Sequence, residues 1–256
     1  MEYMEEIKYF DCDCSFGMRS VRYPGSFYKV QDLVDRMKRY GIDKALVYHS
    51  MAREYNPEVG NRMLTEEIKK YPSLVPVWTV MPHRTDEFPP PHDLIRQMKQ
   101  NNVRMVTMFP AGADQAYSMA EWNCGELFCA LEEHRIPLLL GMEQTSWNEL
   151  YELLSRHSGL NVVLTNVNYR IDRNLYAMLE KSDHLFLETY GYKVYGGIEQ
   201  ICRKFGAHRL IYGSGMPGFS GSAAVSMIAY AQIGEEEKQM IAYKNLKALL
   251  EGVKWE

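Results

Sequence analysis

Short apolar runs alternate with longer helical patterns along the whole chain, and this alternation constrains the fold more than any other feature. The expected strands are Ile7–Cys14, Lys44–His49, Leu74–Met81, Val103–Phe109, Ile136–Met142, Asn161–Val167, His184–Thr189 and Arg209–Ser214. The expected helices are Tyr28–Tyr40, Pro57–Tyr71, His92–Gln100, Glu121–His134, Ser146–His157, Arg173–Lys181, Tyr195–Phe205, Gly221–Gln232 and Glu235–Leu250. Leu33, Met37 and Tyr40, for example, recur at helical spacing. Strands that are each followed by a helix imply parallel pairing with right-handed crossovers.

Eight such units within 256 residues predict an α/β fold, a closed (β/α)8 TIM barrel that forms a single domain over residues 1–256. An open doubly wound sheet is the alternative. The first expected strand is not followed by the glycine-rich fingerprint of dinucleotide-binding sheets. The chain also shows no linker, repeat or low-complexity segment that would divide it.

Composition narrows the class of partner. A net charge of −4 with 46% hydrophobic residues favours neither nucleic acid nor an anionic membrane surface. No apolar run approaches the ~20 residues of a membrane span, and the N-terminal MEYMEEIKYF lacks the features of a signal peptide. Five cysteines, an odd number, suit reduced thiols. We therefore expect a cytoplasmic protein with a small-molecule partner, and the sequence leaves homo-oligomerisation open.

Active sites of such barrels lie at the carboxyl ends of the strands, so residues that finish a strand are the candidates for chemistry. Two segments occupy such positions, DCDCSFG at 11–17 and LIYGSGMP at 210–217. His49 and His83 end the second and third expected strands on the same face. The remaining strand-start and helix-end histidines, which favour solvated or capping roles, are His134, His157, His184 and His208.

Three features together resemble the amidohydrolase-related (amidohydrolase 2) family. They are Asp11 and Asp13 at the end of the first strand, the segment Gly213–Pro217 after the eighth, and Asn245 within the helical AYKNLKALL. The similarity in strand order covers nearly the whole chain. It implies a barrel that usually binds one divalent metal and that hydrolyses or decarboxylates small molecules.

The resemblance also identifies the positions that bind metal in that family. Its first-strand His-x-His pair corresponds to Asp13 and Ser15, its fifth-strand histidine to Gly141, its sixth-strand histidine to Asn166 and its eighth-strand aspartate to Gly215. Serine, asparagine and glycine are poor replacements for zinc ligands. We therefore expect no metal site of the family type and no other cofactor.

Strand alternation predicts which side chains of DCDCSFG reach the barrel mouth. Asp11, Asp13 and Ser15 should share one face, and Cys12 and Cys14 should share the other. If Asp13 faces the mouth, both cysteines face the helices, where we interpret them as small buried hydrophobic residues.

The candidate site is formed by polar side chains at strand ends. The proposed catalytic residues are Asp13, Glu143 and His49. The proposed substrate-binding residues are Asp11, Ser15, His83, Asn166, Arg170, Glu188 and Tyr190. Two enclosed carboxylates, Asp13 and Glu143, can have separated pKa values, so that one donates a proton and the other accepts it. The alternative is a hydrogen-bonded polar plug with a structural role alone.

Three functions are compatible with these residues. The favoured hypothesis is an amidohydrolase-type hydrolase, or related lyase or decarboxylase, acting on a small polar molecule with an atypical centre. The second is a catalytically inactive barrel that serves as a small-molecule binding protein or a regulatory protein. The third is an enzyme with a relocated metal, held by Asp13 and His49 with Glu143 or Glu188.

Overall fold

The computed structural model describes residues 7–22 and 24–255. Most of MEYMEEIKYF, the segment in which we expect no signal peptide, therefore lies outside the described residues. The strands are β1 (Phe10–Phe16), β2 (Lys44–His49), β3 (Leu74–Pro76), β4 (Trp78–Thr79), β5 (Val106–Thr107), β6 (Leu138–Gly141), β7 (Val162–Thr165), β8 (Leu185–Glu188) and β9 (Leu210–Ile211). The α-helices are α1 (Val30–Tyr40), α2 (Ser50–Glu54), α3 (Pro57–Ile68), α4 (Pro91–Gln100), α5 (Glu121–Glu133), α6 (Trp147–Arg156), α7 (Asp172–Lys181), α8 (Gly197–Phe205), α9 (Gly221–Ala229), α10 (Glu235–Gln239) and α11 (Asn245–Glu251). Shorter helical turns are η1 (Met142–Gln144), η2 (Ala207–Arg209) and η3 (Met240–Lys244).

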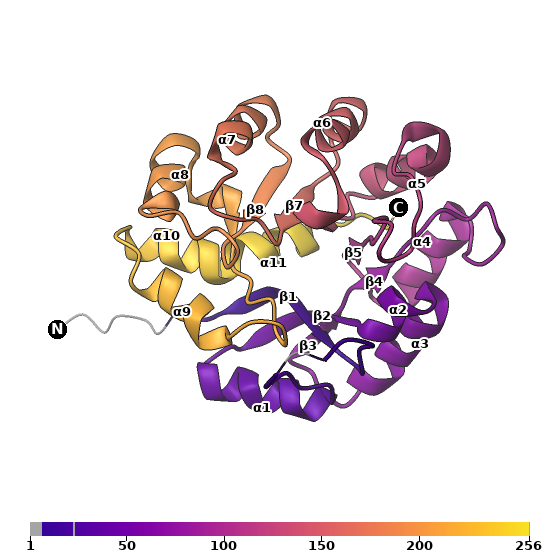
Figure 1. Ribbon diagram of the computed structural model, residues 1–256, viewed down its shortest axis with the longest axis horizontal. Helices are drawn as coiled ribbons and strands as arrows, with labels where there is room; N and C mark the ends of the chain where they lie inside the picture. The colour runs from indigo at the N-terminus through magenta and orange to yellow at the C-terminus, as the bar shows by residue number, and fades with distance from the viewer. Residues whose placement is uncertain (1–6, 23, 256) are drawn as a thin grey trace.

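The strands close into one parallel barrel surrounded by helices (Figure 1). β3 and β4 are two halves of the third barrel strand, because Val77 between them donates its N–H to the carbonyl of Val47 on β2. The ring closes where the Cys12 N–H donates to the Tyr212 carbonyl at 3.0 Å and the Ser15 N–H to the Met216 carbonyl at 2.8 Å. This closure confirms the predicted (β/α)8 barrel and excludes the open sheet.

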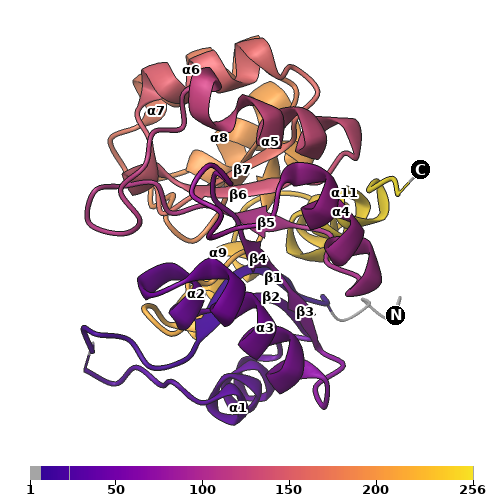
Figure 2. The same ribbon diagram turned by 90° about the vertical axis from the view of Figure 1, so that its right-hand side faces the viewer.

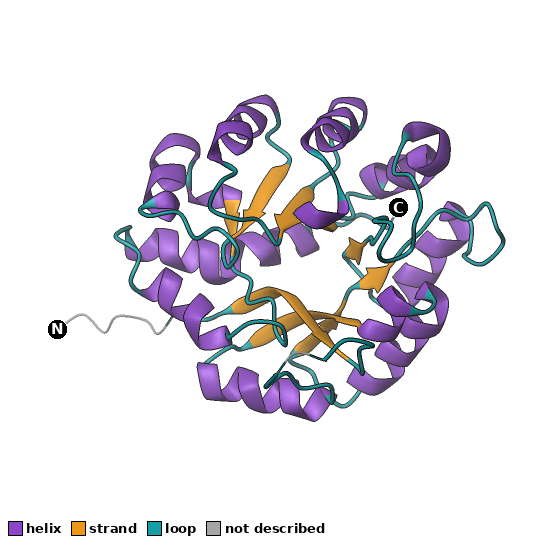
Figure 3. Ribbon diagram, viewed as in Figure 1, coloured by secondary structure: helices purple, strands orange, loops and turns teal. Residues whose placement is uncertain are grey.

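Two layers of apolar side chains stabilise the barrel. The inner layer fills the barrel itself, and α11 covers its lower end with Leu246 and Leu250. The outer layer lies between strands and helices, which form the purple ring around the orange strands in Figure 3. Burying a large apolar side chain stabilises the folded state by ~1.5–3 kcal/mol, so the burial of apolar strand side chains stabilises the closed barrel.

An irregularity in β1 changes which of its side chains face inward. Asp11 pairs with Ala45 on β2 and Cys14 pairs with Val47, so three steps along β1 match two along β2. Such a bulge adds one residue and breaks alternation. As a result Cys12 joins the inner layer, whereas Cys14 joins the outer one. The expectation that both cysteines share one face is therefore wrong, although both are buried as expected.

Two helical features differ from the expected pattern. The short helix α2 follows β2 directly and interrupts the expected loop. The expected helix at Glu235–Leu250 is present, but its middle turn, η3, is π-helical. Figure 2 shows α2 at the same end of the barrel as the loop that follows β1. No helix in residues 7–22 and 24–255 is long and apolar enough to cross a membrane.

Candidate active site

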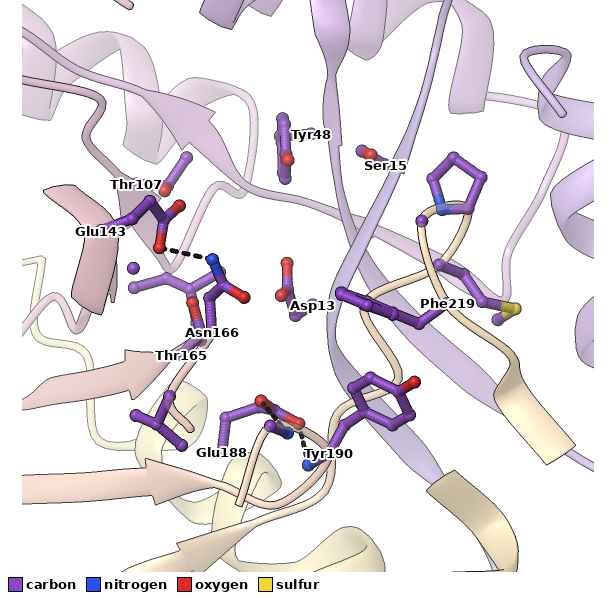
Figure 4. A pocket seen from close by; sticks show the side chains of 18 of the residues that line it. Asp13, Ser15, Tyr48, Thr107, Glu143, Thr165, Asn166, Glu188, Tyr190 and Phe219 are labelled. Atoms are coloured by element: carbon purple, nitrogen blue, oxygen red, sulfur yellow. Dashed lines mark hydrogen bonds between the residues drawn. The ribbon is translucent and has the colours of Figure 1, made fainter. Parts of the chain in front are cut away.

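A cavity of about 610 Å³ lies at the carboxyl ends of the strands (Figure 4). Its lining includes the candidate residues Asp13, Ser15, Glu143, Asn166, Glu188 and Tyr190. These come from β1 near the N-terminus and from the region between β6 and the loop after β8, so closure of the barrel is what brings them together. The expected polar mouth therefore encloses space and is not filled by its own side chains.

Asp13 lies near the centre of the cavity, between the pair formed by Glu143 and Asn166 and the Glu188 side chain (Figure 4). Burial, followed by the negative charges of Asp11 and Glu143, raises the pKa of Asp13 to about 7, although Arg53 opposes the rise. A carboxyl group with that pKa exists in both protonation states near neutral pH, which suits acid–base chemistry.

Glu188 occupies the floor of the cavity, where its side chain is only 2% exposed. Its carboxylate accepts hydrogen bonds from the backbone N–H groups of Tyr190 and Gly191. Burial and then the charge of Asp13 raise the pKa of Glu188 to about 8 against these bonds. A Cβ at Gly213 would lie 2.6 Å from Cγ of Glu188, so the glycine provides the space that this carboxylate fills.

Glu143 and Asn166 form a pair on the opposite wall. Asn166 Nδ2 donates to Glu143 Oε2 at 2.7 Å, and the asparagine adopts a left-handed backbone with φ of 51°. Asparagine tolerates this conformation better than most residues. A Cβ at Gly141 would lie 2.5 Å from Glu143 Oε2, so this carboxylate also occupies space left by a glycine.

Arg53 is a cavity residue that the sequence analysis missed, because it lies on the unexpected helix α2. Its guanidinium forms two hydrogen bonds with Asp114, at 2.6 and 2.9 Å, and its Cζ lies 4.6 Å from the centre of the Phe109 ring. Gln144 Nε2 donates to the same Asp114 carboxylate at 2.8 Å. The bonds hold the guanidinium in a fixed orientation at the cavity wall.

Aromatic rings line much of the remaining wall. Tyr48 and Phe109 lie 5.3 Å apart on the side of Arg53, and Tyr190 and Phe219 lie 4.8 Å apart on the other side. Lys193 Nζ lies 4.4 Å from the centre of the Tyr190 ring. Tyr48 follows β-strand alternation into the cavity and could have been found from the strand pattern.

Four expected site residues do not line the cavity. His49 faces the helices, packs edge-on against Phe16, and accepts at Nδ1 from the Met51 N–H. His83 Nε2 lies 3.6 Å from Glu126 of α5, and Arg170 lies outside the lining with its guanidinium 5.1 Å from the centre of the Tyr169 ring. Asp11 is fully buried behind β1. The structure therefore does not bring His49 together with Asp13 and Glu143, nor with the ligand set of a relocated metal.

Comparison with known proteins supports the resemblance at the level of fold. No family model matches the sequence, and no curated protein matches it. A 2,6-dihydroxybenzoate decarboxylase from Rhizobium superposes with a TM-score of 0.76 at 14% identity, covering 96% of this chain and 99% of that one. A dihydroxybenzoic acid decarboxylase from Polaromonas gives 0.72 at 14% identity, with coverage of 96% and 97%. A candidate amidohydrolase from Staphylococcus aureus gives 0.71 at 12%, with coverage of 96% and 100%. The chain thus has the barrel fold of amidohydrolase-type enzymes.

These neighbours correct the expectation of a site without a cofactor. The Polaromonas decarboxylase was crystallised with bound manganese and the inhibitor 2-nitroresorcinol. A 5-carboxyvanillate decarboxylase was crystallised with manganese and a substituted nitrobenzoic acid. The fold therefore points to a metal cofactor, and the expectation of none is wrong.

The residues of this chain match manganese in donor type but not in arrangement. Carboxylate oxygens are donors that manganese accepts. Glu188 and Glu143, however, are already engaged by backbone amides and by Asn166. Across residues 7–22 and 24–255, no three His, Cys, Asp or Glu side chains are placed to hold one metal ion.

Proposed function

We propose that the protein is a lyase that decarboxylates a small aromatic carboxylate in the cavity at the barrel mouth. The observation that carries the proposal is the placement of the Asp13 carboxyl in an aromatic-walled cavity with a fixed guanidinium, Arg53, on the same lining. The decarboxylase fold neighbours support the same reaction class.

The wall chemistry favours a flat, anionic substrate. Aromatic side chains such as Phe109 and Tyr190 provide faces against which a ring packs. Two hydrogen bonds to Asp114 fix the position of the Arg53 guanidinium. Guanidinium groups recognise carboxylates through paired hydrogen bonds, so Arg53 is suited to an anionic substrate. A cavity of about 610 Å³ is in the usual size range of small-molecule sites.

Asp13 is the proposed proton donor. In the protonated form its carboxyl donates a proton to the ring carbon that bears the substrate carboxylate. The bond from that carbon to the carboxylate then breaks, CO₂ leaves, and the bonding electron pair returns to the ring. Asp13 is left ionised and regains a proton from water. Glu143, fixed by Asn166, is the proposed base that accepts a proton from a ring hydroxyl, which increases electron density at the carbon that is protonated. After CO₂ has left, Glu143 returns this proton to the phenolate oxygen, which restores both the hydroxyl and the carboxylate.

The test is a decarboxylation assay with hydroxybenzoates and carboxyvanillates, run with and without added manganese chloride and followed by CO₂ release. The parent protein should convert at least one of these acids. Asp13→Asn should lower kcat by ~10²–10⁴-fold, the usual effect of losing a general acid. Turnover within about twofold of the parent in Asp13→Asn would refute this assignment.

The control is Asp43→Asn, because Asp43 lies next to β1, where its carboxylate accepts the Tyr9 N–H at 2.8 Å, but is not part of the cavity lining. This variant should retain the activity of the parent. If no acid is turned over while several of them raise the melting temperature, the decarboxylase proposal is wrong and a binding barrel is the better description.

A further inference from the structure

We propose that Lys193, together with Tyr190, forms a second anion-binding position in the cavity, so that the preferred ligand is an aromatic acid with two carboxylate groups. The inference deepens the proposed function and rests on it, because it concerns the same cavity. Lys193 and Tyr190 both lie in the loop between β8 and α8, and both belong to the cavity lining.

Lys193 differs from the other cations of this lining in its partners. Among the described residues, the positively charged side chains of the lining are those of Arg19, Arg53 and Lys193. Arg19 Nε lies 2.9 Å from a carboxylate oxygen of Glu54, and Arg53 forms two hydrogen bonds with Asp114. Lys193 forms no ion pair with a carboxylate in the described part of the chain. Its ammonium group is therefore available to an anion that enters the cavity.

Two aromatic rings keep the ammonium group of Lys193 at the cavity. Its Nζ lies 4.4 Å from the centre of the Tyr190 ring and 5.5 Å from the centre of the Phe219 ring, and both rings are part of the lining. The face of an aromatic ring attracts a cation through its quadrupole and leaves the positive charge in place. The two contacts therefore hold an uncompensated charge on the cavity side of the loop.

Lys193 and Tyr190 also present hydrogen-bond donors that lack acceptors. Lys193 Nζ donates to the Tyr190 hydroxyl oxygen at 3.3 Å, the one side-chain hydrogen bond of this lysine among the described residues. An ammonium group has three N–H donors, and the hydroxyl has a proton of its own to donate. Tyr190 is only 8% exposed, which fixes the position of its ring. Adjacent donors, one of them charged, suit the two oxygens of a carboxylate.

The two cationic positions lie on different walls of the cavity. Arg53 belongs to the wall of Tyr48, and Lys193 belongs to the wall of Tyr190. Figure 4 shows Asp13 between these two tyrosines. A ring with carboxylates at two positions therefore contacts both cations while it lies beside Asp13. Loss of one carboxylate as CO₂, with a proton from Asp13 in its place, leaves a product that keeps only one of the two contacts.

The experiment is isothermal titration calorimetry of the full-length protein with benzoate, isophthalate and terephthalate. These acids lack the ring hydroxyl that the proposed reaction uses, so they report binding without turnover. The parent protein should bind one of the two diacids at least ~10-fold more tightly than benzoate, the usual effect of a hydrogen bond to a charged group. Equal affinities for all three acids would overturn the proposal.

Three variants test whether Lys193 and Tyr190 cause this preference. Lys193→Met keeps the apolar stem against the rings and removes the charge, so the diacid and benzoate should then bind with affinities within about twofold of each other. Lys193→Arg keeps the charge and should retain the preference. Tyr190→Phe removes a neutral donor and should lower the preference by ~2–10-fold. A preference that survives in Lys193→Met, or that is lost in Lys193→Arg, would contradict the proposal, and an unchanged preference in Tyr190→Phe would refute the part of Tyr190.

Lys204→Met is the matched control. Lys204 Nζ also lies over two rings, 5.3 Å from the centre of Tyr176 and 5.0 Å from the centre of Phe205, but Lys204 is not part of the cavity lining. This variant should bind all three acids as the parent does. A parent that prefers a diacid but decarboxylates none of the acids tested would refute the proposed reaction and support the Lys193 position. Turnover of a hydroxybenzoate without a preference for diacids would refute the Lys193 position alone.

Discussion

Replacing Asp13 with asparagine should stabilise the protein at neutral and alkaline pH while it removes the proposed proton donor. In the unfolded chain this carboxyl ionises near pH 3.8, whereas in the folded protein its pKa is about 7. Between these values the native state retains a proton that the unfolded state has lost. The contribution of Asp13 to stability is therefore complete below pH 3.8 and declines as the pH rises through about 7.

The magnitude follows from the change in proton affinity. A tenfold change is worth about 1.4 kcal/mol, so the displacement of the pKa corresponds to a ceiling of ~4 kcal/mol above pH 7. Water reaches Asp13 through the open cavity and screens its charge, which reduces the expected gain to ~1–2 kcal/mol. For a chain of this size that gain raises the melting temperature by ~2–8 °C.

The assay is urea unfolding of the parent and Asp13→Asn, followed by circular dichroism from pH 4 to pH 8. The difference in unfolding free energy should grow in favour of the variant as the pH rises and become constant near pH 8. Glu152→Gln, which removes an exposed carboxylate of α6, is the control for charge removal at the surface. A variant less stable than the parent at pH 8, or a difference that does not change with pH, would refute the reasoning.

Three further changes test the cavity and the fold. Arg53→Lys should raise KM for an anionic substrate by ~10-fold or more, since a hydrogen bond between charged groups contributes ~1.5–3 kcal/mol to binding. Arg156→Lys on the outer surface is the control. Equal KM values for the two variants would count against a contact between Arg53 and the substrate carboxylate. Gly141→Ala should displace the Glu143 carboxylate, 2.5 Å from the added Cβ, and lower kcat/KM by up to ~10²-fold with little change in melting temperature; unchanged kinetics would show that this carboxylate is not used. Asn245→Ala should lower the unfolding free energy by ~1–3 kcal/mol, because Nδ2 donates to two backbone carbonyls at 2.8 and 2.9 Å; denaturant unfolding measures it, and a loss below ~0.5 kcal/mol would contradict the estimate.

The parts of the site that could be predicted are those that depend on strand position alone. Glu188 ends an apolar strand and Tyr190 lies just past it, and Glu143 and Asn166 lie just past two others. The carboxyl ends of parallel strands therefore bring them together. A raised pKa among these carboxyl groups could also be predicted, because carboxylates that are enclosed together repel one another. His83 and Arg170 could not be placed in this way, since they lie in loops whose path depends on tertiary contacts.

The sequence by itself determined the number and order of the barrel strands, because the apolar periodicity of each segment depends only on its own residues. The tertiary structure decided which side chains face the cavity. The bulge between Asp11 and Cys14 reverses the alternation that the sequence implies, so that Asp13 faces the cavity and Asp11 does not. The physical reason is that β1 is paired with partners distant in the sequence: Asp11, at the start of the bulge, accepts a hydrogen bond from the N–H of Ser214, about two hundred residues away. No local pattern records such a contact.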